Sequence, residues 1–434
     1  MYDFLSSLDS LVWGPPLLVL LVGTGIYLST RLVLLHVFRL PKAVKLIFSA
    51  EAKGQGDISS FAALATALAA TVGTGNIVGV ATAIKLGGPG ALFWMWMAAF
   101  FGMATKYAEG VLAIKYRTRD ANGDIAGGPM HYIVNGMGKH WKPLAIAFSI
   151  FGVMVALFGS GTFTQVNSIT DSLNNTVGWS PKVISLVLAV LVSIIIFGGI
   201  QSISKVAEKI VPFMAIIYIL ATLTILAFHF EHIIPGLGLV IRSAFTGKAA
   251  TGGFAGATVV TAIQAGIARG IFSNESGLGS APIAAAAAKT EEPVEQGLVS
   301  MTGTFIDTII ICTLTGLSII VTGGWSCNLN GPTLTQSAFS SVFGNFGVYA
   351  LTISLILFAF TTILGWCYYG ERCFEFLFGV KAIPVYRIVF IAMVALGGYI
   401  SLETIWVIAD IVNGLMAIPN LIALLALSPI IIKE

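Results

Sequence analysis

The 434-residue chain is 56% hydrophobic and only 10% charged, and its mean hydropathy is +0.92. Soluble globular proteins carry about 25% charged residues, so the composition excludes a soluble domain and predicts a polytopic protein in contact with the lipid bilayer. The net charge of +3 is dispersed over separate loops, which excludes a nucleic-acid-binding face. The four cysteines lack metal-ligand spacing, so neither a disulfide framework nor a cysteine metal site is expected.

Apolar runs separated by polar breaks predict eleven transmembrane helices. The first run follows Asp3 and Asp9 instead of basic residues, so it is interpreted as a retained span and not as a signal peptide. The predicted spans are 11–35, 58–86, 88–115, 143–168, 183–201, 206–228, 256–288 (broken), 296–322, 346–370, 383–400 and 404–432.

The basic residues predict the orientation of the chain in the membrane. Alternate loops and the C-terminal tail hold 17 Lys and Arg residues, whereas the other set of loops holds four. Because basic loops stay in the cytoplasm, the N-terminus is expected outside and the C-terminus inside. The inner stretch 122–138 is predicted to lie along the membrane surface, and the uncharged outer stretch 323–344 to cap helix ends.

The spans after the first divide into two groups of five, and the first helix of each group is interrupted by glycines. Five helices per group put the second group upside down relative to the first, an arrangement typical of transporters with a binding site at the bilayer midplane. The predicted organisation is an extra N-terminal helix and cytoplasmic loop (1–57), a first repeat (58–228), an outer loop (229–255) and a second, inverted repeat (256–434).

The first glycine-rich segment, 71–79, places three glycines beside Asn76 where a continuous apolar helix is expected. Each glycine inside a helix costs about 1 kcal/mol relative to alanine. Close helix packing is one explanation, since Gly75 and Gly79 have suitable spacing. We favour an unwound turn, whose amides suit a carboxylate and whose carbonyls suit an ammonium group or Na+.

The second glycine-rich segment, 264–280, contains Arg269 and Glu275. Unpaired charge at membrane depth costs several kcal/mol, so both side chains must face protein or water. A structural ion pair and a gate latch both explain them, and we favour the latch. The residues predicted to contact the substrate in this segment are Gln264, Ser273 and Asn274.

The run Gly87–Gly102 (GGPGALFWMWMAAFFG) resembles the signature of the alanine/glycine:cation symporter family, as do the two glycine-rich segments. The resemblance covers nearly the whole chain. It implies Na+-coupled, and in some members H+-coupled, uptake of alanine or glycine by a multi-pass protein of a prokaryotic plasma membrane. It also implies the five-plus-five inverted-repeat fold of the bacterial leucine transporter, with one extra helix at the N-terminus.

Gly73–Asn76 is similar to the Gly-x-Gly-Asn of the neurotransmitter:sodium symporters, which share that fold. The similarity implies that amides just after the break bind the substrate carboxylate and that carbonyls before it bind the ammonium group and Na+. The implied carboxylate contacts are Thr74, Gly75 and Asn76. The implied carbonyl contacts are Ala70 and Thr71 for the ammonium group, and Ala69 and Val72 for sodium.

The same fold implies a hydroxyl pair on the eighth core helix as sodium ligands, and Thr361 and Thr362 match it, with the Phe358 carbonyl one turn earlier. The alternative is that both hydroxyls bond carbonyls of their own helix. On the third core helix, Phe163 is expected to close the pocket and Gln165 to bind the substrate. Trp366, one turn after Thr362, is expected to limit the size of the substrate side chain.

Four further charged residues lie within predicted spans. Lys106 and Glu109, three residues apart, are expected to pair. Asp307 and Asp410 serve either ion coupling or structural pairing, and both interpretations stay open.

The sequence therefore predicts an all-α membrane protein, and not an enzyme, that couples Na+ influx to uptake of small zwitterionic amino acids by alternating access. An ion channel is the main alternative; a membrane enzyme is disfavoured because the spans contain no HExxH or GxSxG motif. Na+ and H+ both remain candidates for the driving ion, as do L- and D-alanine for the substrate. No obligate protein partner is evident.

Overall fold

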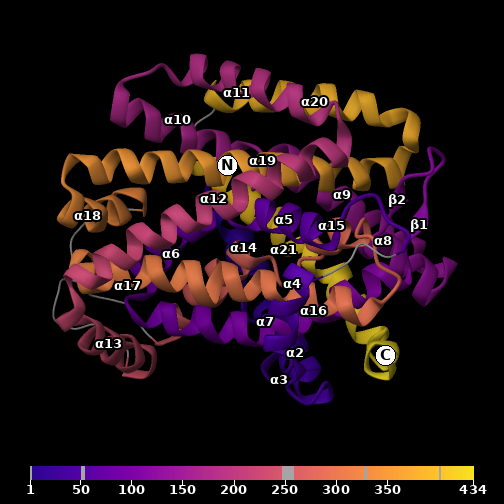
Figure 1. The fold of residues 1–434 in the computed structure, drawn as a ribbon, viewed down its shortest axis with the longest axis horizontal. Helices are drawn as coiled ribbons and strands as arrows, with labels where there is room; N and C mark the ends of the chain where they lie inside the picture. Colours follow the sequence, from indigo (N-terminus) through magenta and orange to yellow (C-terminus); the bar gives the residue numbers. More distant parts are fainter. Residues whose placement is uncertain (1, 50–53, 247–258, 327–328, 330, 400–401) are drawn as a thin grey trace.

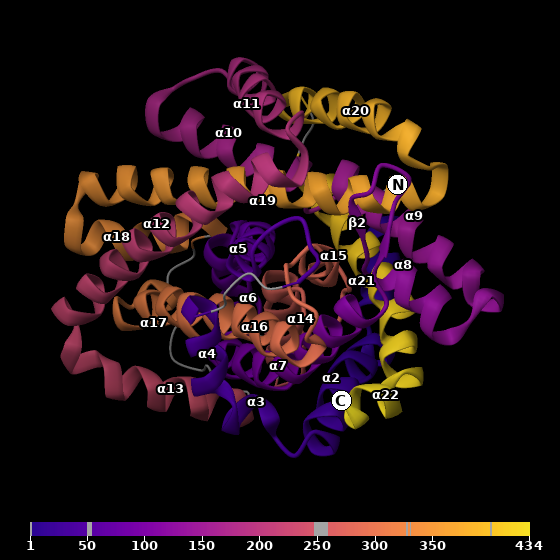
Figure 2. The same ribbon diagram turned by 45° about the vertical axis from the view of Figure 1, so that its right-hand side comes forward.

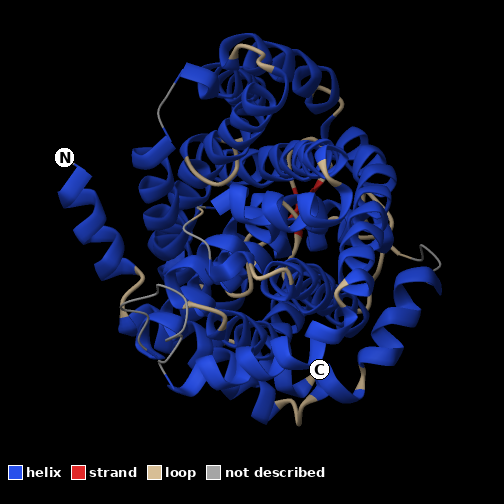
Figure 3. Cartoon of the chain, turned by 90° about the vertical axis from the view of Figure 1, so that its left-hand side faces the viewer, coloured by secondary structure: helices blue, strands red, loops and turns tan. Residues whose placement is uncertain are grey.

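The computed structural model describes residues 2–49, 54–246, 259–326, 329, 331–399 and 402–434. Most of this chain is helical, and Figure 3 shows strands only at one small site within it. Of the four cysteines, Cys327 falls outside the described residues.

The N-terminal quarter contains the extra helix and the first broken helix. A bend of 51° separates α5 from the helical segment that follows it, Gly75–Gly87. The Ser59 hydroxyl caps α5 by accepting a hydrogen bond from the Ala62 amide at 3.0 Å. The elements are α1 (Tyr2–Val12), α2 (Pro15–Arg31), α3 (Leu35–Phe38), α4 (Leu40–Ser49), α5 (Ser60–Thr71), the π-helix η1 (Gly75–Gly79), α6 (Val80–Gly87) and α7 (Gly90–Lys115).

A β-hairpin follows α7 and leads into the next group of helices. The elements are β1 (Thr118–Arg119), β2 (Ile125–Ala126), α8 (Pro129–Tyr132), η2 (Ile133–Met137), η3 (Lys139–Trp141), α9 (Lys142–Phe158), α10 (Phe163–Val177), α11 (Pro181–Ile196), α12 (Gly199–Phe228), η4 (Phe230–His232) and α13 (Ile233–Thr246).

The remaining elements begin with the second broken helix, α14 and α15, between which Glu275–Ser280 is not helical. They are α14 (Val259–Asn274), α15 (Ala281–Ala286), α16 (Pro293–Thr304), the π-helix η5 (Phe305–Cys312), α17 (Thr313–Val321), η6 (Gly324–Ser326), α18 (Gly331–Phe343), α19 (Asn345–Phe378), η7 (Val380–Ala382), α20 (Ile383–Leu396), η8 (Gly397–Tyr399), α21 (Leu402–Ala426) and α22 (Ser428–Lys433).

The long helix α19 crosses the molecule in Figures 1 and 2, with α11 and α20 side by side along its outer edge. The broken helices lie near the centre: α5 packs against α12 and α19, and α14 packs against α6 and α7. Small residues allow this close packing. A Cβ added to Gly365 on α19 would lie 2.7 Å from the Ala70 Cβ on α5.

Seven helices in the described part of the chain are long and apolar enough to cross a bilayer, or eight if the bent pair around η1 counts as one span. This supports a multi-pass membrane protein. The predicted number of eleven stays a proposal, because α11 has 16 residues and the pieces of the second broken helix have 16 and 6.

Three stretches contain more internal structure than the sequence predicted. The predicted span 143–168 is two helices, α9 and α10, separated at Gly159–Thr162. The predicted surface stretch 122–138 contains a β-strand and short helical turns, and the predicted outer loop 229–255 contains the 14-residue helix α13. The described residues of the uncharged stretch 323–344 include η6 and α18, and the Thr335 hydroxyl of α18 donates to the Ile77 carbonyl of η1 at 3.1 Å.

Candidate functional site

The first helix break lies between α5 and η1, and Gly73 is its point of closest approach to α19. A Cβ at Gly73 would lie 2.4 Å from the Thr362 Oγ1 and 3.5 Å from the Gln165 Oε1. The Gly73 amide donates to the Asn76 Oδ1 at 2.8 Å, and its carbonyl accepts from the Asn76 amide at 3.3 Å. Asn76 therefore stabilises the unwound turn from both sides.

Replacing Gly73 with alanine should lower the apparent affinity for substrate at least tenfold, because the added methyl group must displace Thr362; overpacking of this kind costs about 1–3 kcal/mol. Gly79→Ala is the matched control, since a Cβ at Gly79, at the end of η1, meets no atom within 4 Å. Substrate-induced thermal stabilisation of the purified variants measures the effect. Equal stabilisation of the two variants would contradict the assignment of Gly73 to the site.

The second helix break is held in a conformation that side chains rarely adopt. Glu275, Gly277 and Gly279 have φ values of 56°, 89° and 84°. The turn is crowded as well: a Cβ at Gly279 would lie 2.7 Å from the Pro129 side chain. A strained turn that is fully packed is a usual feature of functional sites.

Asp307 on the π-helix η5 joins the two breaks. Its Oδ1 accepts from the Asn76 Nδ2 at 2.7 Å, and its Oδ2 accepts from the Ser273 Oγ at 2.9 Å and from its neighbour, the Thr308 Oγ1, at 2.7 Å. Asp307 is 0% exposed. A carboxylate buried in this way must be compensated by donors or by a cation, and the donors come from both broken helices.

The hydrogen-bond network continues from Thr308 to the end of α14. The Asn274 Nδ2 donates to the Thr308 Oγ1 at 3.0 Å, and the Asn274 Oδ1 accepts from the Ser276 amide at 2.9 Å. Elsewhere the breaks touch directly, since a Cβ at Gly75 would lie 3.0 Å from the Ser273 Cα. Ser273 and Asn274 therefore lie with the first break, although nearly 200 residues separate the two segments.

Thr361 and Thr362, both on α19, face different neighbours. The Thr362 Oγ1 donates to the Phe358 carbonyl at 2.9 Å and faces Gly73, whereas the Thr361 Oγ1 lies 3.6 Å from the Met214 Sδ and 3.0 Å from the Leu357 and Phe358 carbonyls. Both hydroxyls bond their own helix, which was the alternative considered from the sequence. Their lone pairs are not used by these bonds and stay available to a cation.

Two buried oxygens at the first break have no hydrogen-bond partner among the described residues: the Gln165 Oε1 and the Thr74 Oγ1. The Gln165 side chain is oriented by its Nε2, which donates to the Ser160 carbonyl at 2.9 Å. Buried oxygens without partners are costly, so they mark a place where a ligand with donors or positive charge can bind. Phe163, two residues before Gln165, is buried at the start of α10.

The sequence suggested that Glu275 forms a latch with Arg269, but in the structure the two side chains have other partners. The Glu275 Oε1 accepts from the Trp366 Nε1 at 2.9 Å, and its Oε2 accepts from the Ser280 Oγ at 2.5 Å. A Cβ at Gly161 would lie 2.7 Å from the Trp366 Cβ. Trp366 thus links the second break to the break between α9 and α10.

Arg269 forms a bidentate ion pair with Asp410 on α21, with Nη to Oδ distances of 3.1 and 2.6 Å. The ion pair lines a cavity of about 330 Å³ beside α1, and Gln264 lines the same cavity. Gln264 precedes Asn274 by ten residues on α14, which is a rise of about 15 Å along the helix. The structure therefore places Gln264 apart from the other predicted contacts.

A vestibule of about 540 Å³ lies beside the first break. Ile77 and Val78 of η1 form part of its wall, opposite Ser168 and Asp171 of α10, and Trp406 of α21 contributes as well. The Trp406 and Phe272 rings lie 5.8 Å apart. We call the side of the molecule on which this cavity lies the vestibule face.

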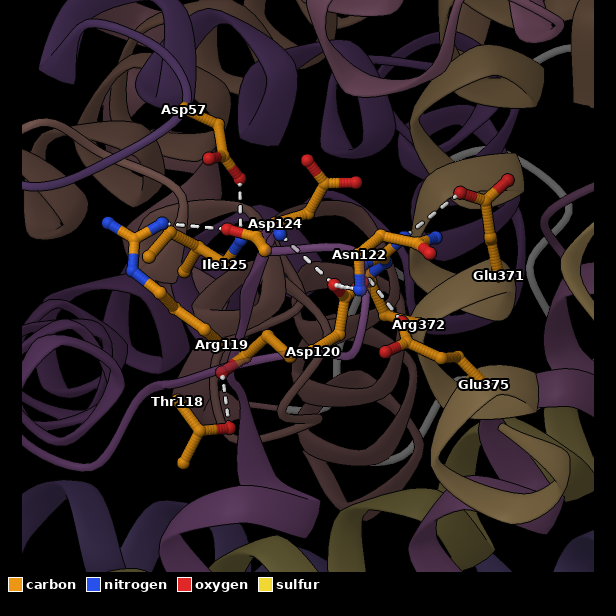
Figure 4. A network of polar contacts seen from close by, with 12 residues as sticks. Asp57, Thr118, Arg119, Asp120, Asn122, Asp124, Ile125, Glu371, Arg372 and Glu375 are labelled. Atoms are coloured by element: carbon orange, nitrogen blue, oxygen red, sulfur yellow. Dashed lines mark hydrogen bonds and ion pairs between the residues drawn. The ribbon is translucent and has the colours of Figure 1, made fainter. Parts of the chain in front are cut away.

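The opposite side, the hairpin face, is closed by polar contacts around the β-hairpin. The Asp120 carboxylate accepts from the Asn122 and Asp124 amides and pairs with Arg372 on α19 at 3.1 Å (Figure 4). The Arg117 guanidinium donates to the Ala286, Ala288, Thr290 and Gln55 carbonyls. These contacts connect the start of α5, the end of α15 and α19.

Asp57 adds to this closure, because its Oδ2 accepts from the Ile125 amide at 2.9 Å. Burial raises the pKa of the Asp57 carboxyl, and the hydrogen bond from Ile125 opposes that rise. On the neighbouring turn, burial and then the nearby Arg372 charge lower the pKa of His131 to about 4. At neutral pH His131 is therefore uncharged beside the Arg372 cluster.

Lys106 and Glu109 do not pair, contrary to the expectation from their spacing. The Glu109 Oε1 accepts from the Asn420 Nδ2 at 2.7 Å, and the Lys106 Nζ has no partner among the described residues. The sequence left two roles open for Asp307, ion coupling or structural pairing, and did not point to Thr308 or Asn420. Asp307 was detectable because it is a lone acidic residue within an apolar run.

The comparisons with known proteins agree with this architecture. The model of the sodium:alanine symporter family matches residues 1–434. The sodium/alanine symporter AgcS of Methanococcus maripaludis is 53% identical over 443 aligned positions, which cover 100% of this chain and 96% of that protein. The amino-acid carrier protein AlsT of Bacillus subtilis is 36% identical, with 96% of this chain and 88% of that protein covered.

Solved structures show the fold at much lower identity. MhsT in complex with L-phenylalanine superposes with a TM-score of 0.58 at 12% identity, covering 87% of this chain and 98% of that one. A manganese transporter mutant of Eremococcus coleocola superposes with a TM-score of 0.51 at 11% identity, covering 88% of this chain and 82% of that one. The fold is that of the leucine transporter-like carriers, and the family is one of transporters and not of enzymes. This multi-pass membrane protein belongs to the sodium:alanine symporter family.

Proposed function

We propose that the protein is a secondary active symporter that couples Na+ influx to the uptake of alanine and glycine by alternating access. The observation that carries the proposal is the first break, where Gly73 lies against Thr362 and two buried oxygens, on Gln165 and Thr74, lack partners among the described residues. A zwitterion and a cation supply the donors and the positive charge that these oxygens need. The name of AgcS, a sodium/alanine symporter, favours the same substrate.

Each end of the substrate has a proposed partner at the first break. The amides of Thr74, Gly75 and Asn76 begin a half-helix, where the partial positive charge suits the carboxylate. The Ala70 and Thr71 carbonyls end the preceding half-helix and suit the ammonium group, together with the Gln165 Oε1. Ser273 and Asn274 support this surface through Asp307 and Thr308.

We place the sodium ion between the end of α5 and α19. Its proposed ligands are the carbonyls of Ala69, Val72 and Phe358 and the hydroxyls of Thr361 and Thr362. Na+ is a hard cation that prefers oxygen ligands. Since Thr362 faces Gly73 while Thr361 faces Met214, Thr362 is the stronger of the two ligands.

Trp366 accounts for a preference for small amino acids in this proposal. Trp366 is 1% exposed and its indole is anchored by Glu275, so the ring is fixed and leaves little room for a long substrate side chain. Gln264 lies apart from this pocket and is not part of it.

The proposed topology follows from the basic loops and from the placement of the two faces. The vestibule face is outside and the hairpin face, with most of the loop Lys and Arg residues, is cytoplasmic. Residues 1–57 form the extra helix and inner loop, 58–228 the first repeat, 229–255 the outer connection and 256–434 the inverted repeat, giving eleven spans in a prokaryotic plasma membrane. The structure then corresponds to a carrier open to the outside.

The test is uptake of labelled alanine into proteoliposomes under an inward Na+ gradient, compared with an equal K+ gradient and with an inward proton gradient at fixed Na+. We expect saturable accumulation that needs the Na+ gradient and is inhibited by unlabelled glycine. Accumulation that is independent of the Na+ gradient would contradict Na+ coupling, and uptake that does not saturate would favour a channel.

A further inference from the structure

Lys106 is a buried charge for which the symport scheme above has no use. It lies near the middle of α7 and is 3% exposed. Its Nζ makes no hydrogen bond and no ion pair within the described residues. An ammonium group in a membrane protein's interior is costly unless other groups compensate it, so its retention calls for a function.

The Lys106 side chain lines a small, mostly apolar cavity of about 20 Å³, between α5, α7, α14, α15 and α16. Its other polar walls include Thr71, Asn274 and Gln296. The Gln296 Oε1 is buried and, like the Lys106 Nζ, has no partner in the described structure. A cavity of this size holds one water molecule, which can accept from the ammonium group and donate to the amide oxygen.

From the cavity wall, a chain of hydrogen bonds leads to the first break. Asn274 donates to Thr308 at 3.0 Å, and Thr308 donates to Asp307 at 2.7 Å. Asp307 accepts from Asn76 at 2.7 Å, and Asn76 accepts from the Gly73 amide at 2.8 Å. This polar relay connects the cavity of Lys106 to the proposed ligand site.

In the other direction, Lys106 lies one turn from Glu109 on α7. Asn420 donates to the Glu109 Oε1 at 2.7 Å and to the Gly277 carbonyl, within the second break, at 2.9 Å. The Lys106 charge acts on three buried carboxylates: Glu109, Glu275 and Asp307. Other titratable groups near these carboxylates are Tyr132 from α8, Tyr369 from α19 and Cys312 at the end of η5.

We propose that Lys106 is a positioning residue for the coupled cation: its ammonium group, bonded to one water in this cavity, is the resident counter-charge that keeps Glu109, Glu275 and Asp307 ionised for Na+. One ammonium group does not balance three carboxylates, so net negative charge remains. A zwitterionic substrate adds no net charge, and the coupled cation supplies the remaining positive charge. This inference rests on the proposed symport.

Lys106→Met tests the inference in proteoliposomes. Without the ammonium group, protons become the counter-charge of the relay and compete with Na+. We expect the ratio of alanine uptake at pH 6 to that at pH 8.5 to fall about tenfold below the wild-type ratio, since protons then compete more strongly with Na+ for carboxylates that have lost their counter-charge. Lys106→Arg keeps the charge and should keep the wild-type ratio, even where the maximal rate falls.

The matched control is Lys115→Met, on the same helix, where the lysine is partly exposed and pairs with Glu434. The ratio of alanine uptake at pH 6 to that at pH 8.5 in Lys115→Met should equal the wild-type ratio. If Lys106→Met is not recovered folded, the double variant Lys106→Met with Glu109→Gln, which removes one charge of each sign, should restore the yield. A wild-type pH ratio in Lys106→Met, or no rescue of its yield, overturns the inference. A wild type without Na+-driven uptake would instead overturn the proposed function.

Discussion

Replacing Thr362 with valine should raise the Na+ concentration for half-maximal alanine uptake by about tenfold to a hundredfold, with a smaller effect of Thr361→Val. The valine keeps the shape of the side chain and removes the oxygen that faces Gly73. Polar interactions with a charged group contribute about 1.5–3 kcal/mol each, and 1.4 kcal/mol corresponds to a factor of ten. Because substrate and ion affinities are linked, alanine affinity at fixed Na+ should fall as well.

Thr222→Val is the matched control for this change. Thr222 on α12 is also buried, and its hydroxyl donates to the Tyr218 carbonyl four residues earlier at 2.8 Å, as Thr362 does to Phe358 at 2.9 Å. The control loses the same kind of bond away from the site, so it should transport normally. Unchanged Na+ dependence in Thr362→Val would show that the ion binds elsewhere.

Asp307→Asn should reduce Na+-driven alanine uptake at least a hundredfold. The carboxylate accepts from Asn76, Ser273 and Thr308, and an amide nitrogen in place of either oxygen would face a donor. Each buried donor left without an acceptor costs about 1–3 kcal/mol, and the change also removes the negative charge that the Asn76 side chain binds at the first break. Labelled-alanine uptake and the melting temperature of the purified variant should be measured together.

A loss of uptake with a melting temperature close to the wild-type value would assign Asp307 to the site; a large drop in melting temperature would assign it to folding. Glu295→Gln, on the exposed first turn of the preceding helix α16, is the control and should change neither quantity. Wild-type uptake in Asp307→Asn would contradict the role of Asp307 in joining the two broken helices.

Local chemistry accounts for the features that the sequence alone determined. A chain this apolar must lie in lipid, and the family matched over its full length confirms the transporter class. Glycines clustered with Asn76 cannot continue a helix cheaply, so the first break was predictable and the 51° bend confirms it. The sequence showed Thr361 and Thr362 as adjacent hydroxyls, but the structure turns Thr362 toward Gly73 and Thr361 toward Met214.

Only the tertiary structure decided which distant groups meet. The spacing of Lys106 and Glu109 favoured an ion pair, yet Asn420, more than 300 residues away, binds Glu109 and leaves Lys106 beside a cavity. Likewise Arg269 pairs with Asp410 and not with Glu275. Desolvation makes a buried charge bind the donor or acceptor that the fold brings within reach. The choice of partner therefore depends on packing between helices, which helical periodicity does not specify.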